Sequence, residues 1–457
     1  MGLRSALQCG LVVCVCGTVL STTHAAVADP KPAIEPIVIV LGGDLGLGGS
    51  RQPISARGGY RHGRMRAWSA LTKGIAPLIN GDLNFANLET VVTDRRRLRP
   101  TGKLYNFRMH PAGVRHLVDV GFNVFSTANN HAIDYGQAGM RETLRHLTAL
   151  RAGGLLAAPG IGRGRAGALR PAELNLKGHE IAISAIGIGG ARLVGDTTRM
   201  GQMAYRSNVD FADAVAALSG VEADYRILSV HYGRERQIRP SASAVRRLRD
   251  QAIRGADVDL VVGHHAHVAA GVQRVGDKLI FYGLGNLLHL GMQNMAKFGA
   301  CRDFGLLARL HVAAGPDGRL RPQAIEAIPL TNMHAAARAM SPRRGRRRIA
   351  VLNGLAAGLD DARAGARGVR FQVLKNGTGL SCLPGAEQLS GRIGSLCQTQ
   401  LASGGRAAAV PARHCGHTVK STARYRKRRT RKRRARRVRA RSARKASHRT
   451  RRRRRSY

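Results

Sequence analysis

The chain has 457 residues, of which 44% are hydrophobic, and its formal net charge is +48. This length and apolar content suffice to bury a hydrophobic core, so they exclude a wholly disordered protein. The charge is far above what solubility requires, and it indicates an anionic partner.

The first 28 residues follow the order of a secretory signal peptide. Arg4 precedes an apolar run at 6–20, and Ala26-Val27-Ala28 forms a cleavage pattern. The run has 15 residues, fewer than the roughly 20 that cross a bilayer as a helix. We therefore expect cleavage after Ala28, with an uncleaved membrane anchor as the alternative. The protein is then exported, and it is periplasmic, extracellular or associated with the envelope.

Five short runs that are apolar on both faces predict strands buried in a sheet. They span residues 37–41, 83–88, 124–127, 227–230 and 260–262. Helical patterns lie between them, most clearly at 137–150 and 243–253. This alternation of strand and helix predicts an α/β fold. Shorter strand signals at 181–186, 279–282, 306–312 and 324–328 predict a second sheet.

Beyond residue 340 the periodicity weakens and the content of Arg, Gly and Ala rises. We therefore expect a folded domain at 29–340, an extension at 341–419 and a basic tail at 420–457. Three cysteines lie in the signal, and the mature chain keeps Cys301, Cys382, Cys397 and Cys415. Four thiols in an oxidising compartment permit two disulfides. We predict that Cys382 pairs with Cys397, which closes a short loop, while Cys301 is equally compatible with an unpaired buried thiol.

The tail from Lys420 to Tyr457 has 22 Lys or Arg among its 38 residues and no acidic residue. Repulsion between like charges and the lack of apolar side chains prevent a core, so we predict a disordered polyelectrolyte arm. Such an arm binds polyanions by releasing their counterions. The arginines predicted to do so are Arg426, Arg428, Arg429, Arg433, Arg434, Arg436 and Arg437.

Polar clusters follow the five predicted strands. They are Gly43-Asp44, Asn87-Leu88-Glu89, Asn129-Asn130-His131, His231 and the run Gly263-His264-His265-Ala266-His267. Open α/β sheets bind ligands beyond the carboxyl ends of their strands, so we expect the clusters to converge. Carboxylates, an amide oxygen and imidazoles are suitable ligands for a pair of divalent transition metals. Each cluster alone favours a turn, a loop or a surface pair over a metal ligand, but five in order, each at the end of a buried strand, favour a metal site.

The order of these clusters is similar to the signature of calcineurin-like phosphoesterases. Four blocks resemble the CapA (poly-γ-glutamate capsule synthesis) family more closely: residues 85–90 (FANLET), 128–136 (ANNHAIDYG), 262–268 (VGHHAHV) and 282–286 (YGLGN). The resemblance covers roughly residues 37–330 and excludes the tail. It implies a calcineurin-like metallophosphoesterase sandwich of two mixed β-sheets flanked by helices.

The resemblance also implies roles for the polar residues. Glu89 bridges two divalent ions, either Mn, Zn or Fe. One ion takes Asp44 and His267, and the other takes Asn130, His231 and His265. His131 matches the proton donor to the leaving group. Asp134 and Asn286 support the site, His264 is the alternative to His265, and Asp82 is a turn residue before its strand.

The chain departs from the phosphoesterase signature at two positions. The second ligand, usually His, stands two residues after the first Asp in that signature, where this chain has Gly46. The ion at Asp44 then keeps only Glu89 and His267, which predicts a site that is weak, singly occupied or empty. The Arg that often follows the first block of the family is replaced by Gly49, with Arg51 two positions later.

Three functions are compatible with the sequence. The leading interpretation is a CapA-type exported protein that acts in synthesis, export or remodelling of an anionic extracellular polymer such as poly-γ-glutamate. Its partners are then that polymer, a wall polymer or nucleic acid, and membrane-associated capsule synthesis machinery, and no nucleotide cofactor is indicated. The second is a secreted metal-dependent phosphoesterase on nucleotides, nucleic acid or wall phosphates. The third is a non-catalytic polyanion-binding envelope protein.

Overall fold

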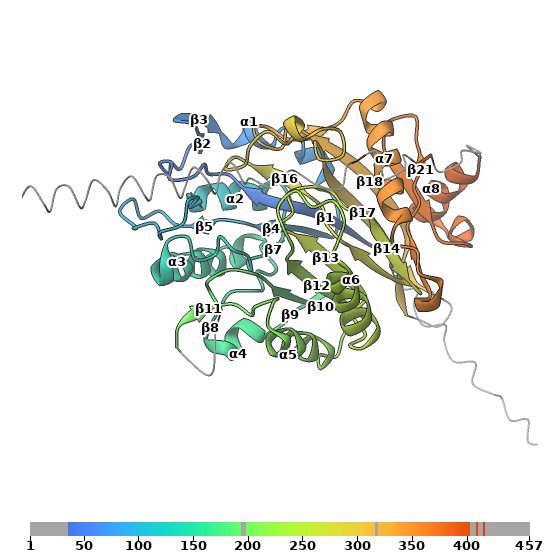
Figure 1. Ribbon diagram of the computed structural model, residues 1–457, viewed down its shortest axis with the longest axis horizontal. Coiled ribbons are helices and arrows are strands. Elements are labelled where there is room, and N and C mark those ends of the chain that lie inside the picture. The colour runs from blue at the N-terminus through green and yellow to red at the C-terminus, as the bar shows by residue number, and fades with distance from the viewer. Residues whose placement is uncertain (1–34, 193–197, 316–318, 403–407, 410–414, 416–457) are drawn as a thin grey trace, which may run out of the picture. The chain divides into compact units, whose positions relative to one another are not determined.

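The computed structural model describes residues 35–192, 198–315, 319–402, 408–409 and 415, which belong to one compact unit that begins at Glu35 (Figure 1). The predicted signal peptide and the arginine-rich tail lie outside the described residues. Within the part that is described, no helix is long and apolar enough to cross a membrane.

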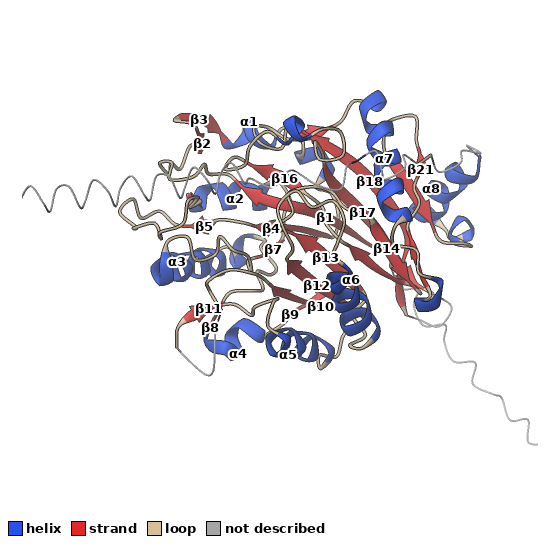
Figure 2. Cartoon of the chain, in the orientation of Figure 1, coloured by secondary structure: helices blue, strands red, loops and turns tan. Residues whose placement is uncertain are grey.

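Two mixed β-sheets form the centre of the described structure (Figure 2). The first contains β1 (Ile37–Gly46), β4 (Leu83–Leu88), β7 (Val124–Ser126), β16 (Asn286–His289), β17 (Gly305–Ala314), β18 (Leu320–Thr331), β19 (Arg338–Ala339), β21 (Gln372–Val373) and β22 (Gly379–Cys382). Strands β1, β4, β7 and β16 run parallel, and β17 pairs antiparallel with β1.

The second sheet contains β9 (Ala172–Leu176), β10 (His179–Ile186), β12 (Tyr225–His231), β13 (Leu260–His264), β14 (Val272–Val275), β15 (Lys278–Phe281) and β20 (Ala366–Gly368). Strands β10, β12, β13 and β15 run parallel in its middle. Two-stranded ribbons pair β2 (Gly58–Arg61) with β3 (Arg64–Ala67), β5 (Val91–Val92) with β6 (Arg108–Met109), and β8 (Gly162–Arg163) with β11 (Met200–Gly201).

Helices flank the two sheets. They are α1 (Trp68–Thr72), α2 (Pro111–Asp119), α3 (Gly136–Ala149), α4 (Gly164–Leu169), α5 (Asn208–Ser219), α6 (Ala242–Arg246) with its π-helical continuation η3 (Arg247–Arg254), α7 (Pro342–Ala357) and α8 (Gly391–Ala402). Leu117 of α2 and Leu147 of α3 pack with the first sheet, and Phe211 of α5 and Leu248 of η3 pack with the second.

The core explains why the strands are apolar on both faces. Ile39 of β1 lies in the cluster between the sheets together with Ile227 of β12, whereas the neighbouring Val40 faces the helices α1 to α3. Leu228 likewise faces α5 and η3. Both faces of each sheet are therefore covered, and hydrophobic runs replace the alternation of a half-exposed strand.

The expected α/β sandwich of two mixed sheets is confirmed, but the expected content of the second sheet is only partly right. The signals at 181–186 and 279–282 form β10 and β15 of that sheet. Those at 306–312 and 324–328 form β17 and β18, which pair instead beside β1 in the first sheet. Apolar content identifies a buried strand, but the choice between two buried sheets depends on long-range pairing.

The segment after Ser341 contributes to both sheets. Strand β20 pairs with β14, and β22 pairs with β18. Helix α7 places Ile349 and Leu352 in the cluster between the sheets. The predicted disulfide between Cys382 and Cys397 is present, and a second disulfide joins Cys301 to Cys415.

Glu326 of β18 gives a prediction for stability against pH. Burial alone would raise the pKa of Glu326, but hydrogen bonding to His311 and the charge of Arg309 lower it to about 2. A carboxylate whose pKa is lower in the folded than in the unfolded chain stabilises the fold at pH values above the unfolded-state pKa of that carboxylate. That stability, on the order of 3 kcal/mol, is lost as the pH falls from about 4.5 to 2. Urea unfolding at pH 7 should therefore show Glu326→Gln to be less stable than wild type, and the difference should shrink below pH 4. An equal difference at both pH values would contradict this account.

Candidate metal centre

The polar clusters converge at the carboxyl ends of strands from both sheets. Asp44 lies on β1, where the pairing register shifts relative to both neighbouring strands, and Glu89 follows β4 directly. Asn130 and His131 follow β7, and His231 ends β12. Such a shift in register bends a strand and re-aims its side chains, here the carboxylate of Asp44.

Glu89 is the centre of the cluster. Its carboxylate is fully buried, and neither oxygen has a hydrogen-bond partner among the described residues. Four imidazole nitrogens of the described histidines surround it: His231 Nε2 at 3.4 Å and His131 Nε2 at 3.8 Å from Oε1, and His289 Nε2 at 3.7 Å and His267 Nδ1 at 3.8 Å from Oε2. Burial raises the pKa of Glu89 well above its usual value.

These distances suit atoms that share a bound cation. They are too long for hydrogen bonds. Ligands about 2.0 to 2.2 Å from one metal ion lie roughly 3.0 to 3.6 Å from each other, so the 3.4 Å contact of His231 lies within this range and the contacts of His289 and His267, at 3.7 and 3.8 Å, lie just above it. An orphaned buried carboxylate is costly unless something positive binds it. The residues present therefore fit a metal ion on each side of Glu89.

Two groups of ligand atoms share Glu89. One is formed by Glu89, His231 and His265, the other by Asp44, Glu89 and His267, and within each group the ligand atoms lie within 4.8 Å of one another. Asn130 adjoins the first group, since its Oδ1 forms a 2.6 Å hydrogen bond with His231 Nε2. This is the division of residues that the resemblance implied.

The loop after β13 holds two histidines in unusual backbone conformations. His265 has φ +85° and His267 has φ +57°, which cost non-glycine residues about 1–3 kcal/mol each and are common at functional sites. The loop amide of His265 donates to Asp44 Oδ2 at 3.3 Å. His267 Nδ1 lies 3.0 Å from Asp44 Oδ2 and 2.9 Å from Asn286 Oδ1. Asn286 therefore lies where a supporting residue was expected.

Electrostatics distinguish the imidazoles. Burial, together with the charge of His267, lowers the pKa of His265 to about 3. Burial also favours neutral His267, but the charge of Glu89 and a hydrogen bond to Asp44 raise its pKa to about 10. In the metal-free protein, the proton on His267 thus supplies positive charge between the two carboxylates.

His131 lies beside the ligand groups and is held by a carboxylate. Its Nδ1 lies 2.6 Å from Asp134 Oδ2, and Asp134 Oδ1 pairs with Lys103 Nζ at 2.5 Å. Phe107 covers the imidazole at 4.3 Å between ring centroids. The Asp134 contact places the proton on Nδ1, so Nε2 faces Glu89 and the site.

The remaining candidates are separated by the structure. His264 Nδ1 lies 3.5 Å from Asp44 Oδ1, outside both groups of ligand atoms, so the geometry favours His265 over His264. Asp82 lies before β4, at the end of the strand remote from Glu89. There it accepts a 2.7 Å hydrogen bond from Val38 N and pairs with Lys177 at 3.0 Å.

Three residues at the site had no role in the sequence prediction. Asn87 donates to Asp44 Oδ1 at 2.8 Å and contacts His231 Nδ1 at 3.1 Å. Lys103 holds Asp134, and the fully buried His289 ends β16 beside Glu89. The sequence did contain a signal for His289. It is a polar residue at the end of the short apolar run Leu287-Leu288, and the other ligands were predicted from polar residues at the ends of apolar runs.

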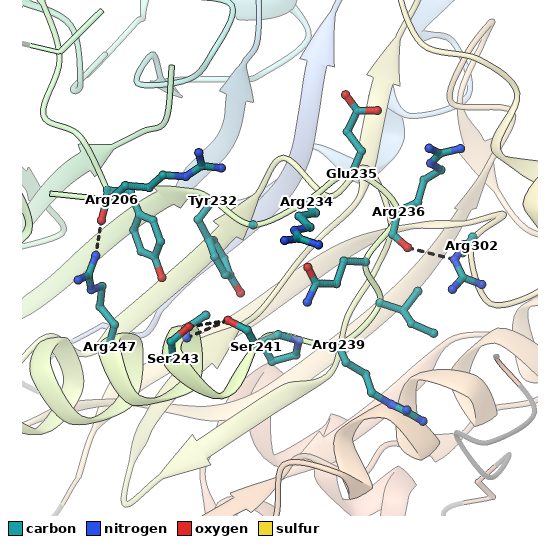
Figure 3. A pocket seen from close by; sticks show the side chains of 16 residues that line it. Arg206, Tyr232, Arg234, Glu235, Arg236, Arg239, Ser241, Ser243, Arg247 and Arg302 are labelled. Atoms are coloured by element: carbon teal, nitrogen blue, oxygen red, sulfur yellow. Dashed lines mark hydrogen bonds between the residues drawn. The ribbon is translucent and has the colours of Figure 1, made fainter. Parts of the chain in front are cut away.

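An arginine-rich pocket of about 850 Å³ adjoins these loops (Figure 3). Six of its described lining residues are arginines: Arg206, Arg234, Arg236, Arg239, Arg247 and Arg302. Glu235 is the acidic residue among those that line it, and its carboxylate points away from Arg234 (Figure 3). Tyr232, which lines the pocket, follows His231 directly in the chain. The amide of Arg236 donates a 2.7 Å hydrogen bond to the carbonyl oxygen of Ala266, the residue between His265 and His267.

The fold and the site define a metallophosphoesterase-like protein: two mixed sheets lie between helices, with carboxylates and imidazoles at the carboxyl ends of the strands. The protein family described as "Bacterial capsule synthesis protein PGA_cap" matches residues 38–289, more than half of the chain. The chain belongs to this family, which is part of the metallophosphoesterase-like superfamily.

Named relatives are similar over part of their length. PGA biosynthesis protein CapA of Bacillus subtilis (strain 168) is 26% identical over 205 residues, which cover 44% of this chain and 52% of the relative. Capsule biosynthesis protein CapA of Bacillus anthracis is 23% identical over 289 residues, which cover 61% of this chain and 66% of the relative. The chain thus spans between about half and two thirds of these relatives. The solved structure of Haemophilus influenzae NAD nucleotidase has 14% identity and a TM-score of 0.36, over 68% of this chain and 61% of that one.

Proposed function

We propose that this protein remodels an anionic extracellular polymer such as poly-γ-glutamate, by holding it in the arginine pocket and hydrolysing it at a two-metal centre. The observation that carries the proposal is the orphaned carboxylate of Glu89, shared by two groups of ligand atoms beside that pocket. Membership of a capsule synthesis family supports the choice of polymer.

The residues at the centre have separate roles in this proposal. Asp44, Glu89 and His267 would hold one ion, and Glu89, Asn130, His231 and His265 would hold the other. Imidazole and carboxylate ligands suit Mn, Zn or Fe. When bound, the two ions supply Lewis-acid activation of water and of the substrate oxygens.

Proton transfer falls to His131. Hydrolysis of an amide adds water to the carbonyl carbon and breaks the C–N bond, and the departing nitrogen takes up a proton. His131 Nε2 faces the site, and Asp134 fixes the orientation of the ring through Nδ1. His131 Nε2 would therefore take up the proton that the attacking water loses and pass it to the departing nitrogen, and Lys103 keeps Asp134 in place.

The arginine pocket supports an anionic substrate. Arg206 and Arg234 are exposed, and neither has a side-chain hydrogen bond or ion pair within the described part of the chain. Guanidinium groups pair with carboxylates and phosphates in a bidentate way. Arg206 also lines a second hollow with Gly189, which packs against Asn130. Exposed cations thus lie on segments that adjoin residues of the centre, namely His231 and Asn130.

Export and assembly complete the proposal. The sequence pattern of a signal peptide and two disulfides support an oxidising compartment outside the cytoplasm. The arginine-rich tail is proposed to bind the same polymer by its charge, and the capsule synthesis machinery at the membrane is the proposed partner.

A phosphoesterase is the second candidate, because paired ligand groups with a neighbouring histidine suit phosphate esters equally well. One experiment separates it from the proposal. The full chain is loaded with Mn²⁺ or Zn²⁺, its metal content is measured, and it is assayed on poly-γ-glutamate and on a generic phosphodiester. Cleavage of the phosphodiester alone would favour the second candidate, and metal-free protein that binds the polymer would favour a binding protein.

The pocket gives a prediction for polymer binding. Arg206→Gln combined with Arg234→Gln should weaken the affinity for poly-γ-glutamate by roughly 10-fold or more and reduce its dependence on salt, since two charge contacts are lost. Arg246→Gln combined with Arg254→Gln is the matched control, because both arginines are exposed but neither lines the pocket, and this variant also loses two charges. Equal losses in the pocket variant and the control would show that binding follows total charge rather than the pocket.

A further inference from the structure

His289 occupies the space next to Gly46. Strands β1 and β16 pair in parallel, with Gly46 opposite His289. A Cβ atom added to Gly46 would lie 2.9 Å from Nε2 and 3.0 Å from Cε1 of the His289 ring, closer than real side chains pack. Gly46 stands where the phosphoesterase pattern has its second ligand. The imidazole of His289 thus fills the place that a side chain at residue 46 would enter.

The ring of His289 points into the centre. Its Nε2 is 3.7 Å from Glu89 Oε2, the same oxygen that His267 approaches. The side chain is fully buried, and Nε2 has no hydrogen-bond partner within the described structure. A buried polar group without a partner costs free energy, which an apolar residue would not. The hydrogen bond that Nδ1 accepts from the amide of Gly291 therefore accounts for one nitrogen of the ring and leaves Nε2 unexplained.

We propose that His289 Nε2 is a ligand of the ion held by Asp44, Glu89 and His267, and replaces the imidazole that is missing at Gly46. This inference depends on the two-metal centre of the proposed function. Glu89 Oε1 lies beside His231, and Oε2 lies beside His267 and His289, so His289 would hold the same ion as His267. The site at Asp44 then has four protein ligands rather than three.

The tautomer of His289 provides a direct signature. His289 Nδ1 accepts a 3.2 Å hydrogen bond from the amide of Gly291, so the neutral ring carries its proton on Nε2 in the metal-free protein. A metal bound to Nε2 requires the proton on Nδ1, at the expense of the Gly291 bond. Metal binding should therefore reverse the tautomer of this one residue.

The experiment measures zinc binding to the full chain and its variants. Wild type should bind two Zn²⁺ ions. His289→Phe, which keeps a ring of similar shape, should bind one ion with wild-type affinity and the other at least 10- to 100-fold more weakly. His179→Gln is the control, since His179 is another buried histidine but contacts the backbone of Glu35. The double variant Gly46→His with His289→Gly moves the imidazole from β16 to β1 and should restore the second ion.

A spectroscopic measurement keeps the test independent of the variants' folding. In wild type labelled with ¹⁵N at histidine, the Nε2 and Nδ1 signals of His289 should exchange their protonated and unprotonated positions when Zn²⁺ is added. Two ions bound by His289→Phe with wild-type affinity, or an unchanged His289 signal in zinc-loaded protein, would overturn the role of His289 alone. Wild type that binds no zinc would overturn the metal centre as well.

Discussion

Glu89→Gln should remove both ions from the centre, whereas Asp82→Asn should leave both in place. Glu89 belongs to both groups of ligand atoms, and an amide nitrogen in place of one oxygen cannot bind a cation. Because the two side chains have the same shape, the variant should still fold. Metal content after zinc loading, measured by mass spectrometry, checks the prediction, and affinity for both ions should fall by at least 10- to 100-fold.

Asp82→Asn is the matched control for a lost carboxylate. Asp82 is also next to β4, but it pairs with Lys177 at the opposite end of the strand. If Asp82→Asn emptied the centre and Glu89→Gln did not, the assignment of the bridging carboxylate would be wrong.

The second large effect separates proton transfer from metal binding. His131→Ala should retain both ions and lose about 10²- to 10⁴-fold in the rate of hydrolysis, because general acid catalysis is typically worth that factor. His265→Ala should lose the ion held with His231, since His265 belongs to that ligand group. Parallel measurements of zinc content and of poly-γ-glutamate cleavage distinguish the two variants.

Asp134→Asn adds a test of how His131 is oriented. Asp134 contacts Nδ1 of His131 and no other imidazole in the described residues, so this variant should also keep its metal and lose activity. Should His131→Ala and His265→Ala lose metal to the same extent, His131 is a ligand rather than a proton donor.

The strands at the site could be predicted from the sequence because two simple rules apply to them. Both faces of β1, β4 and β12 are covered, so each appears as a continuous apolar run. Because ligand sites lie beyond the carboxyl ends of the strands in such folds, the polar residues at the carboxyl ends of these strands were expected to lie close together. These rules identified Asp44, Glu89 and His231, and they distinguished Glu89 from Asp82.

Other features depend on pairings between residues far apart in the chain. Gly46 is a departure in the sequence, but its relation to His289 requires the register of β1 against β16, which are separated by about 240 residues. The arginine pocket draws on residues between 205 and 302, in a chain with 75 Lys and Arg, so none of them stood out. The prediction that β17 and β18 belong to the second sheet was wrong for the same reason, because their pairing partners lie far away in the chain.

The disulfide between Cys301 and Cys415 fixes where the arginine-rich arm leaves the folded protein. Arg302, next to Cys301, lines the arginine pocket and donates a 3.1 Å hydrogen bond to Cys415 O. Only four residues separate Cys415 from Lys420, and the five steps of the chain between these two residues reach at most about 17 Å. In the proposed function, a polymer that binds the start of the arm is thereby held within reach of the pocket, at an effective concentration set by this short linker rather than by the bulk solution. Reduction of that one bond would release the tether while leaving every charge in place.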